Sequence, residues 1–207
     1  MIATASQLPR ESSSDLLKFL QTSAATALQT SQRLEAAVKD YKTPVTYPNS
    51  ALAAKLKSIA QLIDAGLTTR LYYVSIDGWD THSNQAAAHA ALLEQLGDAV
   101  AAFTEDLVRH GYGERVLTMM FSEFGRRVQE NASRGTDHGA AAPLFLAGPK
   151  VKAGLIGMHP SLTDLDDGDL KHHTDFRAVY ATLLDQWLGW NAKAVLGQTF
   201  EGPNVLS

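Results

Sequence analysis

Three polar clusters in this sequence combine carboxylates with imidazoles: IDGWDTHSN, GTDHG and KHHTDFR. Carboxylate oxygens and imidazole nitrogens, with no sulfur among them, suit zinc, manganese or a similar divalent ion. A bound cation lowers the pKa of a coordinated water to about 7 and neutralises charge on a phosphoryl or sulfuryl oxygen. The clusters therefore fit hydrolysis of a small anionic ester. Their metal-binding side chains are Asp77, Asp80, His82, Asp137, His138, His172, His173 and Asp175.

A further motif, SEFGRR, and the end of the third cluster add residues that could support such chemistry. Arginine is a planar, bidentate donor for the oxyanion of an ester, which applies to Arg126, Arg127 and Arg177. Glu123 could bind the metal or orient a histidine that does. We therefore expect these side chains near the metal-binding clusters.

Each cluster also has a purely structural interpretation. Asp80 and His82 could form a turn and cap a helix, Glu123 could pair with Arg126, and 137–138 could lie in a solvated loop. The occurrence of all the clusters near predicted strand ends favours a shared site. The remaining histidines are interpreted as structural: His89, His110 and His159.

The elements before and around the first cluster follow from hydrophobic periodicity. Apolar or small residues at alternating steps of three and four predict a helix over 14–41, and a second helix ends at Gly66. The run RLYYVSID, residues 70–77, is β-branched and aromatic and predicts a buried strand. Ser83 or Asn84 then opens a long helix that Gly111 closes.

Three more strands and a last helix are predicted in the remainder of the chain. Strands are expected over 115–121 and 143–147 with a loop between them, and a short strand at 155–156. Thr174 is expected to cap a final helix that stops at Gly189. Strands and helices in this order predict an α/β fold, a three-layer sandwich with a mostly parallel sheet. In such sheets ligands bind at the carboxyl ends of the strands, where the clusters fall.

Composition narrows the class of protein. A chain of 207 residues with 45% hydrophobic and 19% charged residues is long enough to bury one core. The formal net charge of -4 disfavours a nucleic-acid partner. The absence of cysteine excludes thiolate zinc sites, and no apolar run approaches the roughly 20 residues that cross a bilayer. No signal peptide is visible at residues 1–14.

Five ordered motifs resemble a known family. GWDTHSN, SEFGRR, GTDHG, LAGPKVKAGLIG and TDFRAVYATLLDQWLG follow one another here as they do in the bacterial sulfatase-like family called domain of unknown function 1501 (DUF1501). The resemblance covers about residues 71–189. It implies an alkaline-phosphatase-like α/β/α fold with one or two divalent metal ions, and an exported or periplasmic protein with a twin-arginine signal upstream.

The resemblance also implies a set of metal ligands. Asp137 and His138 match the late Asp-His pair, and Asp80 with His82 match the earlier aspartate and histidine; Asp77 is the alternative to Asp80. The last ligand is His173 in preference to His172. The expected site is therefore a metal centre of Asp80, His82, Asp137, His138 and His173, supported by Asp77, Glu123, Arg126 and Arg177.

One departure from the family pattern bears on activity. The glycine-rich strand end and the serine-histidine motif that begin full-length members are not found here, so residues 1–69 are interpreted as a helical insertion and 70–207 as the C-terminal half of the fold. No nucleophile is identified, because Ser75, Ser83 and Ser122 do not match its position. We therefore expect a phosphate or sulfate ester hydrolase that is inactive as this fragment. The alternatives are a non-catalytic exported binding or scaffold protein and an unrelated cytosolic α/β protein.

Overall fold

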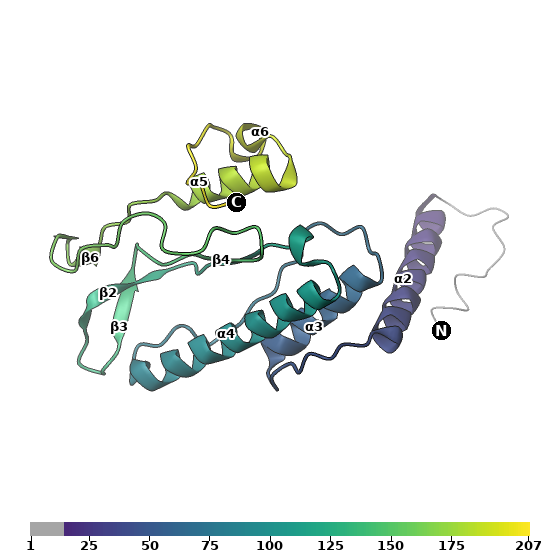
Figure 1. Ribbon diagram of the computed structural model, residues 1–207, viewed down its shortest axis with the longest axis horizontal. Coiled ribbons are helices and arrows are strands. Elements are labelled where there is room, and N and C mark those ends of the chain that lie inside the picture. The colour runs from purple at the N-terminus through teal and green to yellow at the C-terminus, as the bar shows by residue number, and fades with distance from the viewer. Residues whose placement is uncertain (1–14) are drawn as a thin grey trace.

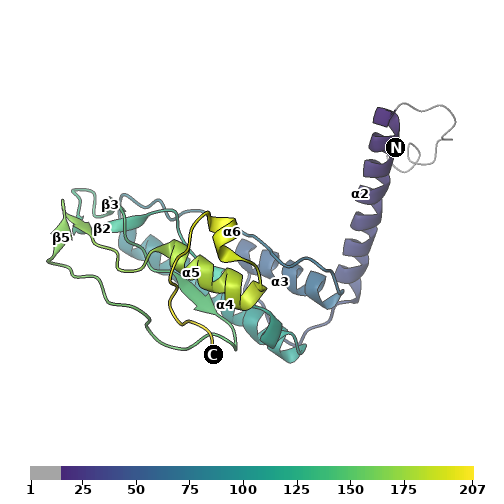
Figure 2. The same ribbon diagram turned by 90° about the horizontal axis from the view of Figure 1, so that it is seen from above.

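The computed structural model describes residues 15–207 as an elongated body of helices and short β-hairpins from which one long helix projects (Figures 1 and 2). The projecting helix is α2, Asp15–Asp40. The helices of the body are α3 Ala51–Asp64, α4 Gln85–Arg109, η1 Gly113–Arg115, α5 Phe176–Thr182, η2 Leu183–Leu188 and α6 Ala192–Leu196.

Helices α3 and α4 pack against each other and form the main hydrophobic core. Ser50 caps α3, because its Oγ accepts the Ala53 N–H at 3.2 Å. The apolar face of α3 is buried, and it meets the buried face of α4 around Phe103. The core residues of the two helices are Leu52, Ala53, Leu56, Ala60, Ile63, Ala99, Val100, Phe103 and Leu107.

The strands are short and form three separate two-stranded antiparallel sheets. They are β1 Thr118–Met120 with β4 Phe145–Ala147, β2 Gly125–Glu130 with β3 Thr136–Gly139, and β5 Leu165–Asp166 with β6 Asp169–Leu170. Neighbouring residues of β1 face opposite ways. Met120 packs on the α3–α4 core, and Met119 packs on a smaller cluster around Val179, Leu183 and Val205.

The predicted parallel sheet and three-layer α/β/α sandwich are wrong, because every strand pair in residues 15–207 is antiparallel. Residues 70–77 form no strand and pair with no strand of the described chain. Tyr72, Val74 and Ile76 pack directly on the α3–α4 core, while Tyr73 on the opposite side is 79% exposed. The alternation that predicted a strand thus reports burial of one face against helices rather than backbone pairing.

Smaller elements also differ from the prediction. No strand forms at 155–156, and the loop expected between the strands 115–121 and 143–147 contains the β2–β3 hairpin. Asp175 rather than Thr174 caps α5, because its carboxylate accepts the Arg177 N–H at 2.8 Å.

The other predicted helices are confirmed within the described residues. Helix α2 covers Asp15–Asp40 of the predicted range 14–41; Ser14 lies outside the described residues, and Tyr41 follows the end of the helix. Asn84 is the N-cap residue of α4, and the left-handed Gly111 and Gly189 follow the ends of α4 and η2 with φ of 78° and 66°. Among residues 15–207, no helix combines the length and apolar character needed to cross a membrane.

Candidate metal centre

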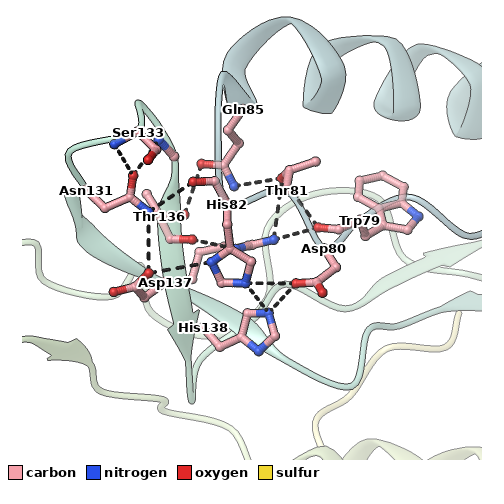
Figure 3. A network of polar contacts seen from close by, with 12 residues as sticks. Trp79, Asp80, Thr81, His82, Gln85, Asn131, Ser133, Thr136, Asp137 and His138 are labelled. Carbon is pink, nitrogen blue, oxygen red and sulfur yellow. Dashed lines mark hydrogen bonds and ion pairs between the residues drawn. The ribbon is translucent and has the colours of Figure 1, made fainter.

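The candidate site forms where the segment before α4 meets the β2–β3 hairpin (Figure 3). Arg126 of β2 joins the two, because its guanidinium donates to the carbonyls of Thr136 at 2.5 Å and Trp79 at 2.6 Å. The segment also donates its Asn84 and Gln85 N–H groups to the carbonyls of the hairpin turn. Five donors in a fixed fork make arginine suited to this bridging role.

Two amides complete the junction. Asn131 donates to the His82 carbonyl at 3.1 Å and accepts the Gly135 N–H at the same distance. Gln85 donates to the Thr81 hydroxyl and accepts from the Thr136 hydroxyl, at 3.1 and 3.0 Å. The segment that carries the ligands is therefore held to the hairpin by side chains as well as by backbone.

Gly135 allows the turn to approach this segment closely. A Cβ at this position would lie 2.3 Å from the His82 carbonyl oxygen, which is closer than real carbon atoms come. The sequence requires glycine here because backbone lies against backbone. This contact sets the distance between His82 and the strand that carries His138.

Three side chains converge at the junction. His138 Nε2 lies 2.7 Å from Asp80 Oδ1, His82 Nε2 lies 2.9 Å from the same oxygen, and the two Nε2 atoms are 3.2 Å apart. Among the described residues these three form the group that could hold a metal ion. A tetrahedral zinc ion with bonds of about 2.0–2.1 Å separates neighbouring ligand atoms by about 3.3 Å. The donor set therefore fits a divalent ion in both chemistry and spacing.

Asp137 contacts the second ring nitrogen of His82. Its Oδ1 lies 3.5 Å from His82 Nδ1 and accepts from the Asn131 amide at 3.4 Å. A proton on Nδ1 that faces Asp137 leaves the lone pair of Nε2 directed at the Asp80 oxygen. Two lone pairs cannot face each other stably at 2.9 Å, so the arrangement calls for a shared cation, either a proton or a metal ion.

The electrostatics of Asp80 agree with this geometry. The hydrogen bond from His138 lowers the pKa of the Asp80 carboxyl below its usual value, and the charge interactions with His82 and His138 act in the same direction. The three side chains are nevertheless open to solvent, with 45% to 67% of each exposed. Such a site leaves room for water or a ligand beside the three donors.

The structure brings together four of the five expected metal ligands and separates the fifth. Asp80, His82, Asp137 and His138 share contacts, whereas no contact joins His173 to them. The four come from a loop and an antiparallel hairpin, not from the strand ends of a parallel sheet.

Of the four expected supporting residues, Arg126 contacts the site, whereas Arg177, Asp77 and Glu123 form no hydrogen bond or ion pair with the cluster. Arg126 binds the backbone carbonyls of the junction rather than Glu123, so the ion pair considered for those two residues does not form. Arg177 pairs with Asp175 at 2.6 Å, away from the cluster. Asp77 and Glu123 make no hydrogen bond or ion pair with residues 15–207.

Several residues of the site gave no sequence signal of their own. Asn131, Gln85 and Thr136 act through backbone and side-chain hydrogen bonds that depend on the hairpin. Asn131 accepts the N–H groups of Ser133 and Gly135. Its place four residues before a glycine is typical of a side chain that closes a turn and was the one available hint.

A family model described as "Protein of unknown function (DUF1501)" matches residues 4–202, so the chain belongs to this family. The match spans all the elements that build the site. No curated protein and no solved structure matches the chain significantly.

Proposed function

We propose that the protein binds a divalent metal ion through Asp80, His82 and His138, and that the ion serves the hydrolysis of small phosphate or sulfate esters. The observation that carries this proposal is the convergence of one carboxylate oxygen and two imidazole nitrogens within 2.7–3.2 Å of one another. The exported or periplasmic location expected from the family resemblance belongs to the same proposal.

The openness of the site favours a catalytic over a structural metal. Structural zinc sites are closed by four protein ligands, whereas catalytic sites keep three and leave a position for water or substrate. Asp80, His82 and His138 supply three donors, and their side chains are 67%, 46% and 45% exposed. When bound, a divalent ion at such a site supplies a Lewis acid and lowers the pKa of coordinated water.

The protein's own residues would prepare the site in distinct ways. Asp80 provides the single negative charge shared by both imidazoles. Asp137 Oδ1 lies 3.5 Å from His82 Nδ1 and would favour a proton there, which leaves Nε2 free as a ligand. Arg126 and Asn131 fix the backbone of the ligand segment, so the donors are in place before an ion arrives.

A non-catalytic metal-binding protein is the second candidate, and the state of Thr81 favours it. Thr81 lies between two of the ligands in sequence, yet its hydroxyl is engaged by Gln85 at 3.1 Å and by Arg126 at 3.4 Å. A hydroxyl held in this way is poorly placed to act as a nucleophile.

An assay of turnover separates the two candidates. Purified protein is incubated with an aryl phosphate and an aryl sulfate, with added zinc or manganese, beside His138→Ala. His159→Ala is the matched control, because His159 is exposed and bonds only the neighbouring Pro160 carbonyl. Hydrolysis that disappears in His138→Ala alone supports the hydrolase. Metal binding without hydrolysis supports the binding protein, and absence of both contradicts the proposal.

A further inference from the structure

We propose that Phe124 is a positioning residue for His138, holding the imidazole in the plane that directs Nε2 at Asp80 and His82. The consequence for metal affinity rests on the proposed metal centre, but the positioning itself can be measured without a metal ion. The argument starts from a stacked pair of rings on the hairpin.

The rings of Phe124 and His138 lie face to face. Their centroids are 3.9 Å apart and their planes differ by 8°. Aromatic pairs usually have centroids 4.5–7 Å apart, so these two rings overlap more fully than most. Stacking of this kind removes rotation of the imidazole about its last side-chain bond.

The polar contacts of His138 alone do not fix the orientation of its imidazole ring. His138 makes its polar contacts through one atom, Nε2, which lies 2.7 Å from Asp80 and 3.2 Å from His82. A ring held at a single atom can still turn, and turning would direct Nε2 away from Asp80 and His82. The flat contact with Phe124 supplies the constraint that the polar contacts lack.

Phe124 is itself anchored on both sides. The next residue, Gly125, is buried, and a Cβ there would lie 1.8 Å from the Ala141 carbonyl oxygen, so backbone is pressed against backbone. On the hairpin, the Arg126 guanidinium lies 5.1 Å from the centroid of the Phe124 ring and also binds the Trp79 carbonyl. Arg126 therefore connects the stacked rings to the segment that carries Asp80.

The surroundings of Phe124 argue against a role in core packing. Neither hydrophobic core cluster includes it, and its ring is half-buried rather than enclosed. Its loss should therefore cost little global stability while releasing His138. This combination distinguishes a positioning residue from a structural one.

Phe124→Ala, Phe124→Leu and Phe124→Tyr test the proposal, with Phe121→Ala as the matched control. Phe121 is a half-exposed phenylalanine next to the same hairpin that contacts Tyr180 instead of the cluster. The NMR signals of the His138 ring protons are assigned by comparison with His138→Ala. In metal-free Phe124→Ala and Phe124→Leu these signals should lose the chemical-shift change that the Phe124 ring causes, whereas Phe124→Tyr and Phe121→Ala should keep it. Leucine keeps the apolar volume without a flat face, so it tests the stacking if the alanine variant does not fold.

Zinc titration of the same proteins gives the second readout. Zinc affinity should fall about 10- to 100-fold in Phe124→Ala and Phe124→Leu, as for other residues that orient a metal ligand, and Phe124→Tyr should restore it. Unchanged His138 ring shifts and unchanged zinc affinity in the folded leucine variant would overturn the proposal. A wild-type protein that binds no zinc would instead contradict the metal centre, and the ring shifts would still decide the positioning.

Discussion

Two carboxylate–imidazole pairs in this protein have the same chemistry and opposite surroundings. At the candidate metal centre, Asp80 is 67% exposed and contacts two histidines. In the helical core, the Asp106 side chain is 0% exposed and lies 3.1 Å from His110 Nδ1. The difference between them lies in how many partners each carboxylate already has.

The buried pair is saturated with donors. Asp106 accepts from the hydroxyls of Thr43 at 2.5 Å, Tyr41 at 2.6 Å and Tyr47 at 2.7 Å. His110 directs Nδ1 at the Asp106 backbone carbonyl at 2.9 Å and Nε2 at the Lys42 carbonyl at 3.0 Å, so both ring nitrogens face acceptors. Every polar atom of this pair has its partner within the chain.

At the exposed site, Asp80 Oδ1 and the Nε2 atoms of His82 and His138 converge, and among the described residues no further side chain lies between them. We infer that the saturated pair stabilises the fold, by joining the 41–47 connection to α4, whereas the open pair is available for a ligand.

The largest effect is expected from removing the buried carboxylate. Asp106→Ala leaves the hydroxyls of Thr43, Tyr41 and Tyr47 without their buried acceptor, so the free energy of unfolding should fall by about 3–5 kcal/mol. Asp80→Ala should leave the free energy of unfolding nearly unchanged, because truncating an exposed side chain costs little. Urea denaturation measures both, and equal losses would contradict the distinction.

Much of the helical part of this comparison could be predicted from the sequence, and the reason is periodicity. Leu52, Leu56 and Ile63 recur on one face of α3, and that face is buried. The strand expected at 70–77 failed because apolar alternation does not reveal what covers the apolar face. The hairpin was missed because GRRVQE, residues 125–130, carries a single β-branched residue.

The sequence predicted which residues form the site better than it predicted the contacts that hold them in place. The motifs around 80–82 and 137–138 already contained the residues that the structure brings together. Arg126 and Asn131 hold these residues in place through hydrogen bonds to backbone carbonyls. These bonds depend on the β2–β3 hairpin, which the residue types did not predict. The role of Asp106 was not predicted at all, because its partners lie about 60 residues away.

The pH dependence of stability should report the buried pair. Burial alone raises the pKa of Asp106, but the hydrogen bonds from Thr43, Tyr41 and Tyr47 outweigh burial and lower it. The hydrogen bond to the Asp106 backbone carbonyl, with the Asp106 charge, raises the pKa of His110. Stability from Asp106 is present above its usual pKa of 3.8 and is lost as the pH falls through the lower folded value.

The contribution of His110 has the opposite sign. It is present below the usual pKa of 6.5 and is lost as the pH rises through the raised folded value. The pair is therefore strongest between about pH 4 and 6.5, and His110→Gln should remove the loss on the alkaline side. Thermal denaturation across pH 3–9 checks this, and an unchanged alkaline limb in His110→Gln would contradict the role given to His110.

A smaller effect is expected at the open pair. Asp137→Asn weakens the acceptor that holds the proton on His82 Nδ1, so zinc affinity should fall about 10-fold while stability is unchanged. Asp164→Asn is the matched control, because Asp164 is an exposed aspartate whose carboxylate pairs with Lys171 and not with the metal centre. Calorimetric titration with zinc distinguishes them, and equal affinities in the two variants would remove Asp137 from the site.

The most direct measurement is calorimetric titration of the metal-free protein with zinc and manganese. The account predicts saturable binding of one ion that is lost in His138→Ala and in Asp80→Ala and retained in His159→Ala, with all four proteins equally folded. Absence of saturable binding by the wild-type protein, or binding that survives in His138→Ala, would show that the convergence of Asp80, His82 and His138 is not a metal centre.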